Sequence, residues 1–349
     1  MEANGKRGLL ERLAEGPVIC AEGYLFELER RGYLQAGAFV PEVVLEHPEK
    51  VLELHREFVH AGSDVVEAFT YYAHREKLRV IGREHDLEPM NRQALQLAKT
   101  VADETGALFA GDVCNTNAYA PGDAESAREV RAMFEEQVAW AAEAGADFVI
   151  AETYSHAAEA LIALEVIREA GLPAVVTLAL HREPATWDGW TPEEACKRLA
   201  DAGADVVGLN CSRGPQTMLP FLEPIVAAVD VPVAALPVPY RTTEEEPTFQ
   251  SLTDERSDSI PDGRPFPTAL DPLFCNRYDI AEFATAAQAA GVRYFGLCCG
   301  NAPHYTRALA EALGRTPTAS RYTADMSKHA FLGTDEHVRA EARSYAARL

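Results

Sequence analysis

One phrase recurs along this chain: a helical pattern, then Ala-Gly and one further residue, then a short apolar run. Glycine suits the end of a helix because it adopts the left-handed backbone conformation at little cost. The apolar runs are nearly continuous, which is typical of parallel strands that are buried on both faces. Clear copies of the phrase begin at His60, Glu143, Asp201 and Ala289, and looser copies begin at Thr105 and Ala170. The repeat therefore predicts helices alternating with the strands of a parallel sheet.

The pattern predicts eight strands, with amphipathic helical segments between them. They fall at residues 17–23, 64–70, 107–113, 147–152, 173–180, 205–211, 232–238 and 292–298. Eight such units in one chain of 349 residues favour a closed (β/α)8 barrel, the TIM-barrel form of the α/β class, over an open sheet. Neither the G-x-G-x-x-G nor the G-x-x-x-x-G-K-[ST] fingerprint follows a strand, so a nucleotide-binding open sheet has little support.

Two segments interrupt the repeat. Residues 239–277 follow the seventh strand and are rich in proline, acidic residues and Ser/Thr, and residues 314–335 follow the last barrel helix. Loops of this length are usually functional or interfacial. We expect a single barrel domain over residues 1–349, in which 239–277 is a lid or a dimer arm and 314–349 is a C-terminal tail.

Charge and composition exclude several classes of partner. The net charge of −22 argues against nucleic acid and anionic membranes, because both reward a basic surface. No apolar run approaches the roughly 18 residues of a membrane span, and the N-terminus lacks the apolar core of a signal peptide. Seven cysteines without the spacing of a small disulfide scaffold predict a reducing compartment. We therefore expect a cytoplasmic protein that acts on small molecules.

Three cysteines fall at the ends of predicted strands, where (β/α)8 barrels carry their chemistry. Cys211 ends the sixth strand, and Cys298 and Cys299 end the eighth, followed by Gly300. A disulfide between adjacent residues is strained, so the pair is read either as buried thiols or as metal ligands. Three thiolates that leave one tetrahedral position open are typical of catalytic Zn²⁺. We favour zinc, and expect Cys114, at the end of the third strand, to be a cavity wall.

The motifs "GLNC" at 208–211 and "GLCCGN" at 296–301 resemble the paired cysteine motifs of the homocysteine S-methyltransferase family. The resemblance runs from about residue 7 to the end and is greatest to the betaine-using branch, through "EHPEKVLELHREF", "AFTYYA" and "GVRYFG". It implies a (β/α)8 barrel that binds a zinc ion through three cysteines. It also implies transfer of a methyl group from a small methylammonium or sulfonium donor to homocysteine, giving methionine. Leu297 replaces the second glycine of the family motif.

The resemblance also implies roles for single residues. Glu152, at the end of the fourth strand, matches the glutamate that holds the amino group of homocysteine, and Tyr72 matches a tyrosine near the zinc and the donor. We treat these two as the catalytic candidates. The expected substrate-binding residues are Glu22, Gly23, Phe39, Tyr71, Tyr72, Glu152 and Thr153.

Several positions depart from the family pattern. The aspartate of the family's D-G-G motif is Ala21 here, and Glu22 follows it. The betaine-contacting tryptophan is Phe39, and the tyrosine after Glu152 is Thr153, although Tyr154 follows. Quaternary ammonium groups are recognised by aromatic faces, so these changes leave the donor open between glycine betaine, a sulfonium such as S-methylmethionine or dimethylsulfoniopropionate, and another methylammonium compound. Tyr71, Tyr72, Phe39 and Tyr154 could form a reshaped cage.

Other functions stay open from the sequence. Glu22 invites the same zinc-thiolate chemistry on a different acceptor thiol. A methyl-transfer module that draws on a folate through a corrinoid partner would need further domains. A non-catalytic barrel with structural zinc, acting as a binding protein, would need a fourth protein ligand. By resemblance we expect a homo-oligomer, with a dimer as the simplest form.

Overall fold

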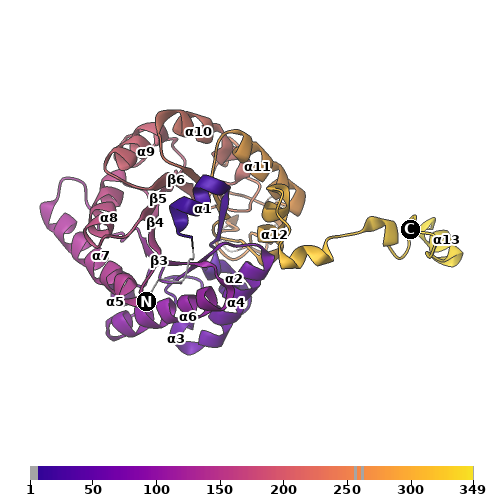
Figure 1. Ribbon diagram of the computed structural model, residues 1–349, viewed down its shortest axis with the longest axis horizontal. Coiled ribbons are helices and arrows are strands. Elements are labelled where there is room, and N and C mark those ends of the chain that lie inside the picture. Colours follow the sequence, from indigo (N-terminus) through magenta and orange to yellow (C-terminus); the bar gives the residue numbers. More distant parts are fainter. Residues whose placement is uncertain (1–6, 255–257, 261–262, 349) are drawn as a thin grey trace.

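The computed structural model describes residues 7–254, 258–260 and 263–348. Eight parallel strands close into a barrel in chain order, and β1 pairs with β8 through Ala21 and Leu297 (Figure 1). The strands are β1 Val18–Ala21, β2 Val65–Glu67, β3 Leu108–Cys114, β4 Phe148–Tyr154, β5 Ala174–Leu178, β6 Val206–Asn210, β7 Val233–Leu236 and β8 Tyr294–Leu297. The (β/α)8 barrel predicted from the sequence is confirmed, and each strand lies within or beside its expected range.

Helices surround the barrel, and further helices fill the connections after β1 and β2 (Figure 1). The α-helices are α1 Leu9–Glu15, α2 Tyr24–Arg30, α3 Val43–Glu46, α4 Pro48–Ala61, α5 Arg75–Val80, α6 Leu87–Thr105, α7 Ala124–Ala144, α8 Ala157–Glu169, α9 Pro192–Asp201, α10 Pro215–Ala228, α11 Arg277–Ala289, α12 Pro303–Ala312 and α13 Ala340–Ala346. Short 3₁₀ helices are η1 Glu84–Asp86, η3 Asp271–Leu273, η4 Thr318–Tyr322 and η5 Met326–Lys328. Leu9 and Leu13 of α1 pack with the barrel interior, so α1 covers the N-terminal end of the barrel.

Hydrogen bonds explain the aspartate that precedes the apolar run in three copies of the repeated phrase. Asp64, Asp147 and Asp205 each stand just before a strand. The Oδ2 atoms of Asp64, Asp147 and Asp205 accept backbone N–H bonds from Ile19, Phe109 and Ala174, at 2.8, 2.7 and 2.9 Å. Each bond ties the start of one strand to the preceding strand. The phrase therefore encodes both the helix end and the strand pairing.

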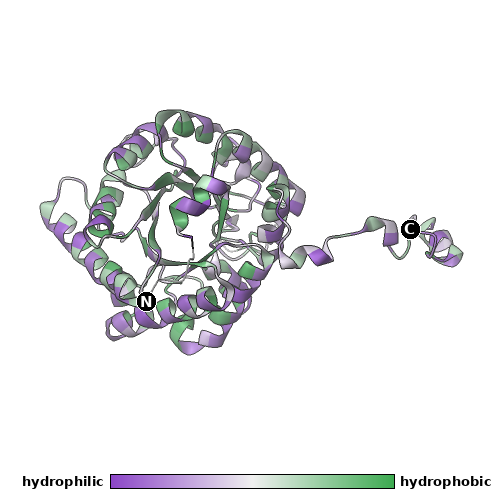
Figure 2. Ribbon diagram, in the orientation of Figure 1, coloured by the Kyte–Doolittle hydropathy of each residue, from purple (hydrophilic) through white to green (hydrophobic). Residues whose placement is uncertain are grey.

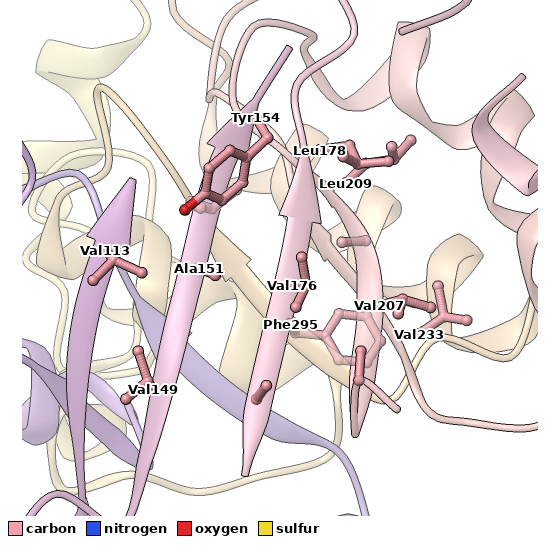
Figure 3. Close-up of a cluster of buried hydrophobic side chains, with 14 of the residues drawn as sticks. Val113, Val149, Ala151, Tyr154, Val176, Leu178, Val207, Leu209, Val233 and Phe295 are labelled. Carbon is pink, nitrogen blue, oxygen red and sulfur yellow. The ribbon is translucent and has the colours of Figure 1, made fainter. Parts of the chain in front are cut away.

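The strands bury both faces, as their apolar runs predict. Outward side chains of β3 to β8 pack beneath the helices, and Figure 3 shows Val149, Val176 and Phe295 among them. Inward side chains such as Val18, Leu108 and Phe148 fill the half of the barrel at the N-terminal ends of the strands. The hydrophobic colour of Figure 2 follows the strands and the inner helix faces, while the outer faces are hydrophilic. This packing leaves the C-terminal ends of the strands as the place for a site.

The two interrupting segments behave differently. In the described part of residues 239–277, Tyr240, Phe249 and Leu270 are buried in a core above the barrel's C-terminal end. Residues 255–257 and 261–262 of this segment lie outside the described residues. The tail beyond η4 extends away from the barrel and ends in α13 (Figure 1), with Leu332 and Tyr345 exposed. Across the described ranges, no helix combines the length and apolar character needed to span a bilayer.

Candidate active site

The three predicted cysteines meet at the C-terminal end of the barrel. The Sγ atom of Cys299 lies 3.8 Å from that of Cys211 and 3.9 Å from that of Cys298. All three cysteines are free thiols, and their Sγ atoms lie within 4.8 Å of one another. Within the described ranges, this mutually close group contains no fourth His, Cys, Asp or Glu. Cys114 lies apart from it, and its Sγ accepts the backbone N–H of Tyr72 at 3.2 Å.

Unusual backbone turns bring these sulfurs together. Cys211 and Ser212 adopt left-handed φ angles of 56° and 53°, which residues other than glycine rarely adopt. Gly300 has φ +96°, and a Cβ atom there would lie 2.6 Å from the hydroxyl of Tyr240. Gly23 has φ +90°, and a Cβ atom there would lie 2.5 Å from the carbonyl oxygen of Cys298. Glycine at 23 and 300 therefore permits the close packing of the strand ends around the thiols.

The sulfur spacing fits zinc. Bond lengths of about 2.3 Å and tetrahedral angles place two zinc-bound sulfurs about 3.8 Å apart. The observed Sγ separations of 3.8 and 3.9 Å match that edge. Thiolate donors suit zinc better than magnesium or calcium. Hydrogen bonds from Cys298 and Cys299 hold the pKa of the Cys211 thiol well below its usual value, and the contact with Cys211 raises the pKa values of Cys298 and Cys299, so one anionic sulfur is favoured in this group.

A hydrogen-bond network supports Glu152 beside the thiols. Asn210, the last residue of β6, donates through Nδ2 to Glu152 Oε2 at 2.5 Å and to Thr153 Oγ1 at 2.8 Å. Thr153 Oγ1 donates to the same Glu152 oxygen at 2.9 Å, and the Thr153 backbone N–H donates to Asn210 Oδ1 at 3.0 Å. The Asn210 amide also lies 3.9 Å from the Sγ of Cys298. One amide thus joins the Glu152 carboxylate to the sulfur group.

A small inner cavity of about 30 Å³ lies between the thiols and the barrel interior. Four acidic residues line it: Glu22, Glu67, Asp112 and Glu152. Burial and neighbouring carboxylates raise the pKa values of Glu22, Glu67 and Asp112 well above their ordinary values. Burial raises the pKa of Glu152 to about 7. Of the sequence candidates, this cavity also collects Gly23, Tyr71, Cys298 and Cys299.

An outer cavity of about 180 Å³ adjoins the inner one, sharing Leu25, Tyr71 and Cys299 with it. Its walls are largely aromatic: Phe26, Phe39, Tyr71, Tyr72, Trp187, Phe249 and Phe266. Thr153 and Cys211 also line it, so every remaining substrate candidate from the sequence reaches one of the two cavities. Aromatic faces next to the cysteine sulfurs can receive a small methylated cation.

Tyr71 and Tyr72 differ in how accessible their rings are to a ligand in the outer cavity. The rings of Tyr71 and Tyr72 lie 4.3 Å apart between centroids, and both line the outer cavity. The ammonium nitrogen of Lys77 lies 3.9 Å from the centroid of the Tyr72 ring. That face of Tyr72 is therefore not open to a donor cation, whereas Tyr71 reaches both cavities.

Tyr154 is not part of the cage, contrary to the possibility raised by the sequence. Thr153 adopts φ 63°, and the pairing of β4 with β5 shifts register between Ala151 and Tyr154. This turn brings the Thr153 hydroxyl to Glu152 and sends the Tyr154 ring outward, beneath the helices (Figure 3). The ring is fully buried there, edge-on to Phe134 at a centroid distance of 6.0 Å.

The structure also adds residues that the sequence reasoning missed. Trp187, in the segment after β5, stacks on His181 at 4.8 Å between ring centroids, and both line the outer cavity. Phe249 and Phe266 come from residues 239–277. The positions of Glu67 and Asp112 could have been found from the sequence. Alternate residues of a strand share one face, so Glu67 faces inward with Val65, and Asp112 faces inward with Leu108 and Ala110. The position of Trp187 could not have been found in this way, because the course of its loop depends on tertiary contacts.

Comparison with known proteins agrees with this geometry. A sequence model of the family described as Homocysteine S-methyltransferase matches residues 20–313. The chain is 38% identical over 353 residues to betaine–homocysteine S-methyltransferase 1 of Xenopus tropicalis, covering 97% of this chain and 84% of that protein. It is 36% identical over 348 residues to S-methylmethionine–homocysteine S-methyltransferase BHMT2 of Pongo abelii, covering 97% and 91%.

A solved structure supports the fold. The metallated form of the homocysteine methyltransferase MmuM from Escherichia coli matches with a TM-score of 0.66 at 20% identity, over 86% of this chain and 98% of that one. The family match spans the barrel from β1 to the end of α12 and includes all three clustered cysteines. The chain is therefore a methyltransferase that belongs to the homocysteine S-methyltransferase family.

Proposed function

We propose that this enzyme transfers a methyl group from a small cationic donor to the thiol of homocysteine, giving methionine, with zinc held by Cys211, Cys298 and Cys299. The observation that carries the proposal is the sulfur group itself, with Sγ separations of 3.8 and 3.9 Å beside an aromatic-walled cavity. Zinc held by these three residues would favour the thiolate form of an acceptor thiol that binds beside them.

The acceptor is held on the inner side. The carboxylates of Glu152 and Glu22 lie within 4.8 Å of each other and of the Cys298 sulfur, at bonding reach for the ammonium group of an amino acid. Asn210 and Thr153 hold the Glu152 carboxylate in place. Fixing the acceptor by this group places its sulfur near the three cysteines and removes much of the entropy cost of reaction.

The donor is held on the outer side, among Phe39, Tyr71 and Trp187. In the transfer, a sulfur–carbon bond forms on the acceptor while the bond from the methyl carbon to the donor nitrogen or sulfur breaks. The electron pair of that bond stays with the donor, which loses its positive charge. Because charge disappears, walls that exclude water favour the transition state. The names of the relatives support glycine betaine and S-methylmethionine as the first donors to test.

A different acceptor thiol is the second candidate. Glu22 is buried beside the thiols where the family pattern has glycine, and it adds a carboxylate to the acceptor side. An acceptor with more positive charge than homocysteine would suit this wall. The alternative of a non-catalytic barrel with structural zinc has less support, because the sulfur group has no fourth ligand within the described residues.

Location and assembly are part of the proposal. The seven cysteines are all free thiols, which supports the cytoplasm as the working compartment. We propose a homodimer. The tail that leaves the barrel, with Leu332 65% and Tyr345 53% exposed, supports an arm that packs on a second copy. The burial of Phe249 and the place of Phe266 in the outer cavity support a lid role for residues 239–277.

Methionine formation from homocysteine, measured by mass spectrometry with isotopically labelled methyl donors, tests the proposal. We expect labelled methionine from at least one of glycine betaine, S-methylmethionine and dimethylsulfoniopropionate, and about one zinc per chain by elemental analysis. Cys211→Ala should lose the zinc and the activity together. Cys196→Ala, a matched change at a cysteine buried in the outer core, should keep both. Zinc binding without product from any donor would contradict homocysteine as the acceptor.

A further inference from the structure

The outer cavity has a polar part that the inner cavity does not share. Ser155, His181 and Trp187 line the outer cavity only, whereas Cys299 and Tyr71 line both. Among the described residues of the outer wall there is no lysine, arginine, aspartate or glutamate. A methyl donor that turns its cationic group toward the sulfurs must place the rest of its structure against other parts of this wall. The chemistry of the polar part therefore bears on which donors fit.

A buried cation lies behind this part of the wall. Arg213 is 6% exposed and forms no salt bridge among the described residues, and the exposed Glu183 acts on it only from beyond salt-bridge distance. Its Nη2 donates to the backbone carbonyls of His181 and Arg182, at 2.7 and 3.1 Å, and its Nε is buried without a partner. Arginine is rarely buried this deeply without a paired anion. Arg213 therefore leaves positive charge next to His181 that an anion from outside the chain can balance.

A hydrogen-bonded pair in the same wall has one donor to spare. The Nε2 of His181 lies 2.8 Å from the Oγ of Ser155. If Nδ1 carries the proton, the serine hydroxyl donates to Nε2 and the Nδ1–H is unused. If Nε2 carries it, the imidazole donates to the serine and the serine O–H is unused. Within the described ranges neither side chain forms another hydrogen bond, so either tautomer leaves one polar hydrogen for a ligand.

Packing holds this pair in place. The Trp187 ring stacks on His181 with an interplanar angle of 27°, and the Trp187 backbone N–H donates to the carbonyl of Ser155 at 2.8 Å. The ring of His156 meets Trp187 edge-on at 5.5 Å between centroids. A hydrogen-bond donor that is already ordered costs little entropy when it binds a ligand. The pair and the guanidinium behind it thus form a preorganised receptor for a carboxylate.

We propose that the His181–Ser155 pair, positioned by Arg213, binds the carboxylate of a zwitterionic methyl donor and so determines donor specificity. The onium group of the donor faces the cysteine sulfurs, and its carboxylate faces the pair and the buried charge of Arg213. This arrangement aims the methyl group at the acceptor sulfur and selects onium carboxylates over cations that lack the carboxylate. The inference rests on the proposed methyl transfer and adds the residues that recognise the unreactive end of the donor.

Isothermal titration calorimetry on the full-length, zinc-loaded protein tests this role without requiring turnover. Two pairs of probes differ chiefly in the carboxylate: glycine betaine with choline, and dimethylsulfoniopropionate with trimethylsulfonium. We expect the wild type to bind the carboxylated member of at least one pair about tenfold more tightly. The double variant His181→Phe/Ser155→Ala keeps a ring against Trp187 and removes both donors. It should lose this preference by weakening the carboxylated probe alone, and His181→Gln, which keeps an N–H donor, should retain most of it.

Variants of Arg213 separate a role in charge from a role in packing. Arg213→Met should reduce the preference for the carboxylated probe, and Arg213→Lys, which keeps the positive charge, should retain more of it. A purely structural role would weaken both members of a pair alike. His60→Phe changes an exposed histidine of α4 and should behave as the wild type.

Three results would overturn the proposal: equal affinity of the wild type for both members of each pair, no binding of either carboxylated probe, or an unchanged preference in the double variant. The methyl-transfer proposal is judged separately, by labelled methionine. Methionine formed equally well from trimethylsulfonium and dimethylsulfoniopropionate would support methyl transfer and overturn the carboxylate site. A carboxylate preference that the double variant abolishes, without product from any donor, would support the site and contradict methyl transfer to homocysteine.

Discussion

The side-chain amide of Asn210 donates a 2.5 Å hydrogen bond to the carboxylate of Glu152, and this bond joins the ends of β6 and β4 next to the thiols. The same amide lies 3.9 Å from the Cys298 sulfur. Asn210 is fully buried and precedes Cys211 directly. The residue that orients Glu152, the carboxylate proposed to bind the acceptor, thus directly precedes Cys211, a proposed metal ligand.

Replacing Asn210 with alanine should therefore impair the site more than the fold. Supporting residues of this kind typically change activity or metal affinity by about 10–100-fold. We expect Asn210→Ala to raise the KM for homocysteine by about tenfold or more, because Glu152 loses its strongest donor, while the KM for the donor changes little. Steady-state kinetics with each substrate varied in turn provide the measurement. A change confined to the donor KM would contradict the assignment of Glu152 to the acceptor.

Sequence periodicity predicted much of the architecture, for physical reasons that these residues illustrate. Strands buried on both faces are visible in the sequence as apolar runs. Because the C-terminal ends of all strands in one barrel lie at the same end, the sequence alone predicts that Cys211, Cys298 and Cys299 lie close together. Tyr154 could not be placed, because its direction depends on the left-handed turn at Thr153. Trp187 could not be found, because the route of a loop is set by the contacts that it makes in three dimensions.

Gly300→Ala should destabilise the protein and weaken zinc binding. The left-handed conformation costs a side-chain-bearing residue about 1–2 kcal/mol, and overpacking adds about 1–3 kcal/mol. Both apply at Gly300, where φ is +96° and a Cβ atom would lie 2.6 to 2.8 Å from atoms of Tyr240. Gly314 provides the control, because its φ is +77° but a Cβ atom would meet nothing within 4 Å.

Urea denaturation and zinc analysis of the two variants measure the difference. Gly314→Ala should lose only the conformational part of the free energy of unfolding and keep its zinc. Gly300→Ala should lose more free energy and bind zinc more weakly, since Cys298 and Cys299 immediately precede it. If the two variants were equally stable, the Tyr240 contact would not restrict this turn.

Trp187→Ala should weaken the use of the cationic donor. Its side chain is 62% exposed at the rim of the outer cavity and stacks on His181. A cation–π contact at an exposed site contributes about 0.5–1 kcal/mol, which corresponds to about a two- to fivefold rise in the donor KM. The homocysteine KM should stay as in wild type, and Trp187→Phe should retain most of the affinity. An unchanged donor KM in Trp187→Ala would place the donor elsewhere in the outer cavity.

His55 should make the fold sensitive to acid. Its ring is 1% exposed, packs against Tyr24 at 4.9 Å between centroids, and has no hydrogen-bond partner at either nitrogen within the described chain. Burial lowers the pKa of His55 to about 3, against an ordinary value of about 6.5 in an unfolded chain. The unfolded state therefore binds the extra proton first. The stabilising contribution of neutral His55 is complete above about pH 6.5 and is lost progressively as the pH falls toward 3.

At pH 5, about 1.5 pH units below the unfolded pKa, this difference corresponds to about 2 kcal/mol of unfolding free energy. Urea denaturation at pH 7.5 and pH 5 measures the free energy of unfolding at each pH. Between these pH values His55→Leu should lose about 2 kcal/mol less of this free energy than wild type does. His337→Gln, an exposed control, should follow the wild-type pH dependence. His74, whose pKa burial lowers to about 4, is present in all of these proteins, so its contribution cancels in the comparison. Identical pH dependence of His55→Leu and wild type would mean that the buried imidazole gains a proton without cost.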